Sequence, residues 1–201
     1  MDIGTRYGPA EAELEQAGEP RFLLVLTHGA GGRIDAPDLL AARGAGVRLG
    51  GAVARVLQPY RVRGARAPGS AQRQDQAWLD VIGALRGAVP GVPLVQGGRS
   101  NGARLACRTA AAAGARAVLA LAFPLHPPGH PERSRAAELR AAGTDILVLN
   151  GDRDPFGLPG TIGATRVIVL PGETHSLSKH PQAVGDAVET WLREVLRLPA
   201  G

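Results

Sequence analysis

The sequence predicts an α/β protein built on a mostly parallel β-sheet with helices on both faces. Strand-length apolar runs alternate six times with helical segments along the 201 residues, and no internal repeat is detectable. Several of these runs are continuously apolar, as expected for strands that are buried on both faces of a sheet. One run meets a glycine pair and a serine and then turns directly into an alanine-rich helical segment, over residues 94–106. Together these features indicate a parallel sheet with crossover helices.

The composition is that of one globular domain. Two hundred residues can enclose a sizeable core, and 44% of them are hydrophobic, so we expect a single domain over residues 1–201. Aromatic residues make up only 3% of the chain, so Leu, Val and Ala must build the core. The net charge of +5 comes from arginines spread along the whole chain with acids between them. This spread does not favour a nucleic-acid partner.

No feature of the sequence indicates export or a membrane. The one cysteine, Cys107, cannot form a disulfide within the chain, and we expect it to be a small buried apolar residue. The first 20 residues lack the apolar segment of a signal peptide, and no stretch approaches 18 apolar residues. We therefore expect a cytoplasmic protein with no membrane partner, either a monomer or a homodimer.

The elements are expected in the following order. Residues 1–20 are polar and acidic, and we expect a short helix there at most, outside the core. The predicted strands are residues 22–27, 60–63, the run from Leu94 to the glycine pair, 118–123, 145–150 and 166–170. The predicted helices are a glycine-broken segment within 36–56, an amphipathic helix over 74–85, the segment after Ser100, residues 132–141 and residues 183–198.

Residues 98–102 fit the G-x-S-x-G pattern of a nucleophile elbow. In such an elbow a serine occupies a strained strand-to-helix corner, and its hydroxyl projects above the edge of the sheet. Glycines are needed two positions before and after the serine, because a side chain there would collide across the tight turn. Ser100 would also lie at a helix N-terminus, where free backbone N–H groups favour developing negative charge.

The first predicted strand ends in a glycine-rich turn, His28-Gly29-Ala30-Gly31-Gly32. Such a turn can hold a phosphate, direct a backbone N–H towards a substrate oxyanion, or serve only as a tight turn. The spacing fits neither of the two common phosphate-binding fingerprints, and no Gly-Lys-Ser/Thr follows. We favour the oxyanion role, with the backbone N–H groups of Ala30 and Asn101 as the two donors.

Three candidate catalytic residues follow three different strands. The carboxyl ends of parallel strands meet at one edge of the sheet, and the segments that carry Ser100, Asp154 and His175 all leave that edge. A serine hydroxyl needs an imidazole to take its proton, and a carboxylate fixes the tautomer of that imidazole. The order Ser, Asp, His along the chain is the order found in the α/β-hydrolase fold.

Each of these assignments has a rival. Asp152 is a second candidate for the carboxylate, but Asp154 lies where the turn is expected to curl back towards the histidine. His180 lies near the last helix and is expected at the surface, so we prefer His175. The remaining histidines precede the acid-bearing strand and break the order, so structural or pocket-wall roles suit them better; these are His28, His126 and His130.

The chain resembles a compact α/β-hydrolase family over roughly residues 22–195. Its relatives include actinobacterial proteins, more distantly dienelactone-hydrolase-like enzymes, and the hydrolase-like domain of a subunit of a eukaryotic histone-acetyltransferase complex. The blocks that carry the resemblance are residues 27–32, 98–104, 123–129, 153–157 and 175–177. The resemblance implies a catalytic triad at Ser100, Asp154 and His175. Dienelactone hydrolases proper have cysteine at the elbow, so Ser100 argues against their particular reaction.

The resemblance implies a minimal version of the α/β-hydrolase fold, with about six strands and no cap domain. The usual antiparallel first pair of strands would be absent or vestigial in residues 1–20. Only about 20 residues separate the strands at 118–123 and 145–150, which is room for one helix and no lid. We expect an open site, with candidate substrate-binding residues Gly29, Gly31, Arg99, His126 and Phe156.

Two functions remain after these arguments. The first is a serine hydrolase without metal or other cofactor, which cleaves small carboxylic esters or thioesters through an acyl-enzyme. The second is a catalytically silent module of the same fold that binds a ligand or a partner, because a fold alone does not establish an activity. Nucleotide binding at the Gly29 turn is the least favoured.

Overall fold

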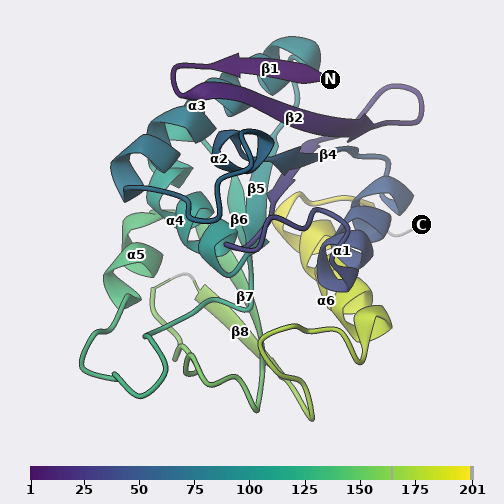
Figure 1. The fold of residues 1–201 in the computed structure, drawn as a ribbon. Helices are drawn as coiled ribbons and strands as arrows, with labels where there is room; N and C mark the ends of the chain where they lie inside the picture. The colour runs from purple at the N-terminus through teal and green to yellow at the C-terminus, as the bar shows by residue number, and fades with distance from the viewer. Residues whose placement is uncertain (164, 200–201) are drawn as a thin grey trace.

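The protein forms a single twisted sheet with helices on both faces (Figure 1). The computed structural model describes residues 1–163 and 165–199. Over these residues the sheet has eight strands in the order β1-β2-β4-β3-β5-β6-β7-β8, and β3 to β8 run parallel. The parallel strands are β3 (Leu23–Thr27), β4 (Ala52–Leu57), β5 (Leu94–Arg99), β6 (Ala117–Leu121), β7 (Asp145–Gly151) and β8 (Thr165–Leu170).

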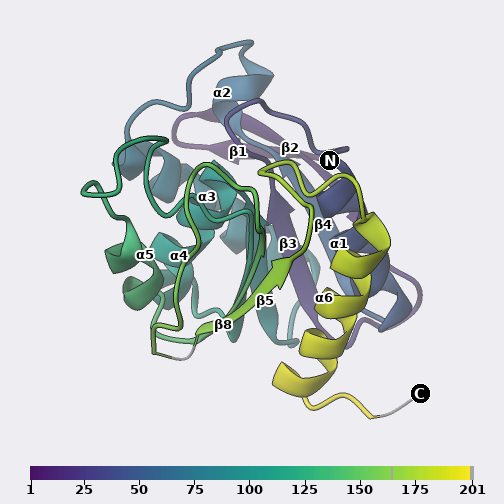
Figure 2. The ribbon, with the colours of Figure 1, turned by 90° about the horizontal axis from the view of Figure 1, so that it is seen from below.

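The helices lie in two layers. They are α1 (Pro37–Arg48), α2 (Pro59–Val62), α3 (Ala71–Ala88), α4 (Asn101–Ala113), α5 (Ala136–Ala141) and α6 (Pro181–Val195). Figure 2 shows α1 and α6 on one face of the sheet and α3, α4 and α5 on the other. Apolar side chains of α1 and α6 pack together on the first face, and those of α3 share a second cluster with β3 and β4. The predicted α/β architecture is therefore confirmed, and the described residues include no separate cap domain.

The N-terminal segment is the main correction to the sequence analysis. Residues that were expected to lie outside the core form a hairpin of β1 (Asp2–Thr5) and β2 (Gly8–Glu15), and β2 pairs antiparallel with β4. Ile3, Ala10 and Ala12 are buried there, whereas Glu11 and Glu13, which alternate with the alanines, are exposed. Alanine is small and is depleted in strands, so this alternation is a weak strand signal. The sheet accordingly has eight strands where about six were predicted.

Residues 52–62 were also assigned wrongly. Residues 52–57 form β4, although they were predicted to continue a helix, and Pro59–Val62 is a short helix where a strand was expected. Gly50 ends the preceding helical segment in the left-handed region, at φ +75°. Pro59 then opens α2, because proline fits the first position of a helix, where no N–H bond is required.

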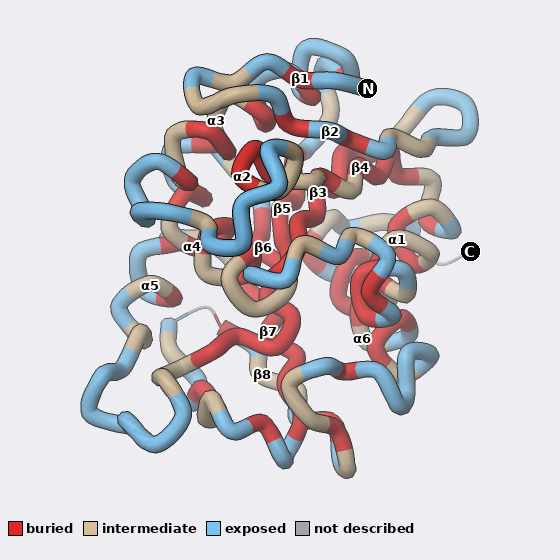
Figure 3. The backbone as a smooth tube through the Cα atoms, viewed as in Figure 1, coloured by how far each residue is buried: buried red, intermediate tan, exposed pale blue. Residues whose placement is uncertain are grey.

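The core lies along the central strands (Figure 3). β5 carries the buried polar residue Gln96, whose Oε1 accepts a hydrogen bond from Trp78 Nε1 (2.9 Å) and whose Nε2 donates to the carbonyl of Ala106 (2.7 Å). These bonds satisfy the buried amide.

Cys107 is fully buried, and burial raises the pKa of its thiol to about 12. None of the described helices has the length and apolar character that crossing a membrane requires.

Candidate active site

Ser100 occupies a strained corner between β5 and α4. Its backbone has φ +53° and ψ −112°, a region that side-chain-bearing residues rarely adopt. The glycines around it are required by contact. A Cβ at Gly98 would lie 2.5 Å from the carbonyl oxygen of Thr27, and one at Gly102 would lie 2.7 Å from that of His28. The corner has the strand–turn–helix context that a nucleophile elbow requires.

Three side chains form a continuous hydrogen-bonded chain at this corner. His175 Nε2 lies 2.8 Å from Ser100 Oγ, and His175 Nδ1 lies 2.8 Å from Asp154 Oδ2. Since the carboxylate can only accept, Nδ1 carries the proton when the ring is neutral, and Nε2 is left free to accept the serine proton. The structure therefore brings together the three residues that the sequence analysis singled out, each from a loop after a different strand.

Asp154 is fixed by bonds from its own turn. Its Oδ1 accepts from the backbone N–H of Phe156 (2.9 Å), and the side-chain amide of Asn150 at the end of β7 donates to Oδ2 (3.3 Å). The side chain is fully buried. The rival carboxylate, Asp152, is exposed and accepts instead from the backbone N–H of Gly172 (2.8 Å). Of these two carboxylates, that of Asp154 contacts His175.

The His175 loop is held from two sides. The ring of Phe156 packs against the imidazole, with 4.2 Å between ring centroids and 34° between ring planes. Arg99 Nη2 donates to the backbone carbonyl of His175 (3.0 Å). Arg99 Nε in turn donates to Asp38 Oδ2 (2.9 Å), and the Asp38 side chain is completely buried. Burial raises the pKa of the Asp38 carboxyl above its ordinary value.

Asp38 was missed by the sequence analysis. It follows Pro37 in the first turn of α1, where an acidic residue is common because it complements the helix dipole. No local pattern distinguishes it from an ordinary exposed acid at such a position. Its contact with Arg99 joins segments 61 residues apart, so only the folded structure reveals it.

The segments that carry the two predicted oxyanion donors both adjoin Ser100. Asn101 begins α4, and the glycine-rich turn that carries Ala30 passes so close that a Cβ on Gly29 would lie 3.3 Å from Ser100 Cβ. Neither the Ala30 nor the Asn101 backbone N–H donates to a protein acceptor within residues 1–163 and 165–199. Both donors are therefore free to bind a ligand oxygen.

The glycine-rich turn is fixed by Tyr60 and His28. The Tyr60 hydroxyl donates to the carbonyls of Gly29 (3.3 Å) and Ala30 (3.2 Å). His28 is fully buried; its Nδ1 donates to the carbonyl of Gly29 (2.6 Å), and its Nε2 accepts from the N–H of Gln58 (3.0 Å). Burial lowers the pKa of His28 to about 4. His28 thus occupies a structural position, and the rival His180 is exposed at the start of α6.

The predicted substrate-binding residues fall into two groups. Gly29, Gly31 and Arg99 line a cavity of about 390 Å³ beside the elbow. Phe156 lies instead against the His175 ring, and His126 packs against the backbone of Gly157 with its Nδ1 2.9 Å from the carbonyl of Pro127. His130, by contrast, is exposed beside Glu132.

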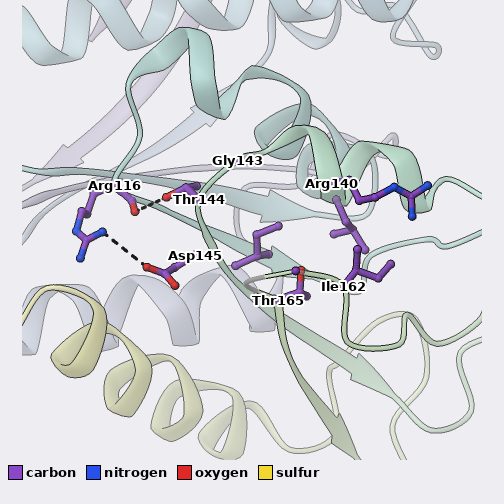
Figure 4. A pocket seen from close by; sticks show the side chains of 10 residues that line it. Arg116, Arg140, Gly143, Thr144, Asp145, Ile162 and Thr165 are labelled. Atoms are coloured by element: carbon purple, nitrogen blue, oxygen red, sulfur yellow. Dashed lines mark hydrogen bonds and ion pairs between the residues drawn. The ribbon is translucent and has the colours of Figure 1, made fainter.

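A cavity of about 520 Å³ lies at the opposite end of the sheet (Figure 4). It is bordered by Arg116, Arg140 and Asp145, and Asp145 is the first residue of β7. Among its described lining residues there is no serine, cysteine or histidine. These lining residues therefore lack both a serine or cysteine nucleophile and a histidine base. In the part of the chain that the structure describes, no group of acidic, histidine and cysteine side chains is arranged to hold a metal ion.

Comparison with known proteins identifies the family of the chain. The family model described as "Alpha/beta hydrolase domain" matches residues 20–193. The chain belongs to this α/β-hydrolase family. The compact α/β-hydrolase resemblance noted in the sequence is thereby confirmed, and so is the fold class. No curated protein matches the chain.

Several solved structures share the fold of this family member. An α/β serine hydrolase without lid from Xanthomonas campestris aligns with a TM-score of 0.79 and 18% identity, covering 100% of this chain and 95% of the other. A serine hydrolase homologue from Coxiella burnetii aligns at 0.80 and 15%, covering 96% of each chain. Est1E from Butyrivibrio proteoclasticus aligns at 0.77 and 16%, covering 98% of each. At these identities the similarity concerns the fold alone.

Proposed function

We propose that the protein is a serine hydrolase that cleaves small carboxylic esters or thioesters through an acyl-enzyme. The observation that carries the proposal is the chain of two 2.8 Å contacts from Ser100 Oγ through His175 to the buried carboxylate of Asp154. The order and geometry of these groups are those that activate a serine hydroxyl. Membership of the α/β-hydrolase family supports the same reaction class.

The proposed reaction proceeds in two stages. Ser100 Oγ attacks the substrate carbonyl carbon while His175 Nε2 takes the hydroxyl proton, and Asp154 stabilises the resulting imidazolium. The backbone N–H groups of Ala30 and Asn101 donate to the oxyanion. His175 then returns its proton to the departing alcohol or thiol, leaving an ester on Ser100. Water attacks that ester with His175 as general base, which releases the acid and restores the serine.

The open site favours small or extended substrates. Between β6 and β7 the chain forms only the six-residue helix α5 and loops, so no separate lid covers Ser100 in the described residues. Without a lid, little apolar surface surrounds a long acyl chain. We therefore expect short acyl esters to be better substrates than long-chain lipids.

The first test is covalent labelling of the serine. A fluorophosphonate probe is expected to label the wild-type protein once per chain, and p-nitrophenyl esters of short acids are expected to be hydrolysed. Ser100→Ala should abolish labelling and lower kcat by a factor on the order of 10⁶. Mass spectrometry of the labelled peptide identifies the modified residue.

Ser176→Ala is the matched control. Ser176 is exposed and lies next to His175, and within the described residues its hydroxyl hydrogen-bonds to Thr174 and Ser178 and not to the His175 ring. Its loss should leave labelling intact. Labelling that survives Ser100→Ala, or the absence of turnover with every acyl substrate, would contradict the proposal and favour a silent binding module.

A further inference from the structure

Positive charge is concentrated in one segment of the chain. Residues 39–74 contain seven arginines and neither aspartate nor glutamate. Three of them form ion pairs with glutamates of β2 and α6: Arg43 with Glu15, Arg48 with Glu189 and Arg55 with Glu13. The other four form no ion pair within the described residues; they are Arg61, Arg63, Arg66 and Arg73.

Two of these four arginines line a cavity of about 500 Å³ between α2, the loop that follows it and the start of α3. They are Arg63 and Arg73, and none of the residues that line this cavity is acidic. The cavity at the other end of the sheet differs, because there Asp145 lies 3.7 Å from Arg116 and offsets its charge. The cavity beside α2 therefore carries uncompensated positive charge.

Tyr7, in the turn of the β1–β2 hairpin, holds both arginines in place. Arg63 Nη1 donates to the Tyr7 carbonyl, and the Arg73 guanidinium lies 5.7 Å from the centre of the Tyr7 ring. These contacts leave most N–H groups of each guanidinium unused, since each has five. The guanidinium groups of Arg63 and Arg73 are thus positioned before any ligand arrives, which lowers the entropy lost on binding.

This cavity adjoins the candidate active site. Tyr60, which lines it, donates to the carbonyls of Gly29 and Ala30. Gln74 also lines it and accepts a hydrogen bond from the side chain of Asn101 (2.7 Å). Two lining residues therefore touch the two residues whose backbone N–H groups are the proposed oxyanion donors. A substrate held at Ser100 has the charged cavity as its neighbour.

We propose that this cavity binds an anionic group of the substrate, a phosphate, sulfonate or carboxylate that lies away from the reacting carbonyl. Guanidinium groups bind such oxyanions through paired, charge-assisted hydrogen bonds. The same positive charge raises the encounter rate of anionic substrates and is screened by salt. A role in substrate binding rests on the ester-cleaving function proposed above, whereas binding of an anion at Arg63 and Arg73 does not depend on it.

The kinetic test compares two matched substrate pairs. The acetyl thioesters of N-acetylcysteamine and of coenzyme A differ by phosphates on the leaving thiol. The p-nitrophenyl ester of butyric acid and the mono-p-nitrophenyl ester of succinic acid differ by a carboxylate on the acyl group. In R63Q/R73Q we expect kcat/KM to fall about tenfold or more for at least one anionic substrate and to change less than twofold for its neutral partner. R63K/R73K, which keeps the charge, should retain most of the preference.

R21Q/R140Q is the control for net charge. Both arginines are exposed; Arg21 precedes β3, and Arg140 lines the cavity at the far end of the sheet. This variant loses the same two charges but should keep the wild-type substrate preference. An equal response of anionic and neutral substrates to R63Q/R73Q would overturn the proposal.

Binding without turnover separates this proposal from the hydrolase function. Inorganic pyrophosphate is expected to raise the Tm of the wild-type protein and of R21Q/R140Q, and to leave that of R63Q/R73Q unchanged. If no ester is cleaved but this pattern holds, the hydrolase function fails and the anion site stands. If pyrophosphate shifts all three proteins equally or none of them, the anion site is refuted.

Discussion

Asp152 and Asp154 are two positions apart, yet their carboxylates have different surroundings. Asp154 is buried and contacts His175, whereas Asp152 is exposed and bonds to a backbone N–H of the following turn. If Asp154 orients the imidazole, Asp154→Asn should lower kcat by a factor on the order of 10⁴, because the amide favours the wrong tautomer of the histidine. Steady-state kinetics with a p-nitrophenyl ester measures the loss.

Asp152→Asn is the paired control and should keep kcat within about twofold, since its substitution leaves the imidazole contacts intact. Circular dichroism should show both variants folded. A comparable loss of kcat in the two variants would mean that the effect comes from the loop and not from the carboxylate at 2.8 Å from His175.

The sequence reveals a site residue where a reactive residue type directly follows a recognisable strand. Ser100, Asp154 and His175 each follow a recognisable strand, and a parallel sheet brings such loops to one edge. Asp38 could not be found in the same way. It lies on a helix, and its burial and its ion pair with Arg99 of β5 arise only when the chain folds.

At the scale of the elements, Arg99 connects a strand, a helix and a loop that are distant in sequence. It ends β5, forms an ion pair with Asp38 of α1 and donates to the carbonyl of His175 in the loop before α6. The Asp38 side chain is completely buried, and that of Arg99 is 19% exposed. Removal of one partner from such a buried pair leaves an uncompensated charge, at a cost of about 3 to 5 kcal/mol. Arg99→Met should therefore lower the free energy of unfolding by about that amount, as measured by urea denaturation.

The double variant Asp38→Leu/Arg99→Met separates stability from positioning. Replacement of both ions by apolar side chains is often neutral, so stability should recover to within about 1 kcal/mol of the wild type. The carbonyl of His175 still lacks its donor, so kcat should be lower than in the wild type although stability is restored. A double variant with wild-type kcat would show that Arg99 contributes stability only.

The elements that the sequence analysis missed share one physical cause. Three of the strands predicted correctly, β3, β6 and β7, are largely continuous apolar runs, which composition alone makes recognisable. β2 alternates alanine with glutamate, and β4 begins with Ala52-Val53-Ala54, so neither carries a strong strand preference. Their conformation depends on pairing with each other and, for β4, with β3. That pairing is a tertiary interaction, which local patterns do not encode.

At the scale of the whole molecule, His28 makes stability depend on pH. Its ring is fully buried and is satisfied only when neutral: Nδ1 donates to Gly29, and Nε2 accepts from the N–H of Gln58. A proton on Nε2 would remove that acceptor and place a charge in the interior. Burial accordingly lowers the pKa of His28 to about 4 from its ordinary value of 6.5.

The unfolded chain therefore binds a proton at His28 at a higher pH than the folded chain does. Stability from this group is fully present above about pH 6.5 and is lost as the pH falls from 6.5 towards 4. The loss amounts to about 3 kcal/mol for a shift of this size. Other groups also titrate in this range, so the wild-type curve alone does not isolate the histidine.

Comparison of the wild-type protein with His28→Gln isolates the contribution of His28 to the pH dependence of stability. Glutamine does not titrate, and its misfit in the buried site costs a similar amount at every pH. Urea denaturation should find the variant less stable than the wild type at pH 7, with the difference in unfolding free energy reduced by about 3 kcal/mol at pH 4. A difference that stays constant between pH 7 and pH 4 would show that His28 takes up a proton in the folded protein as readily as in the unfolded chain.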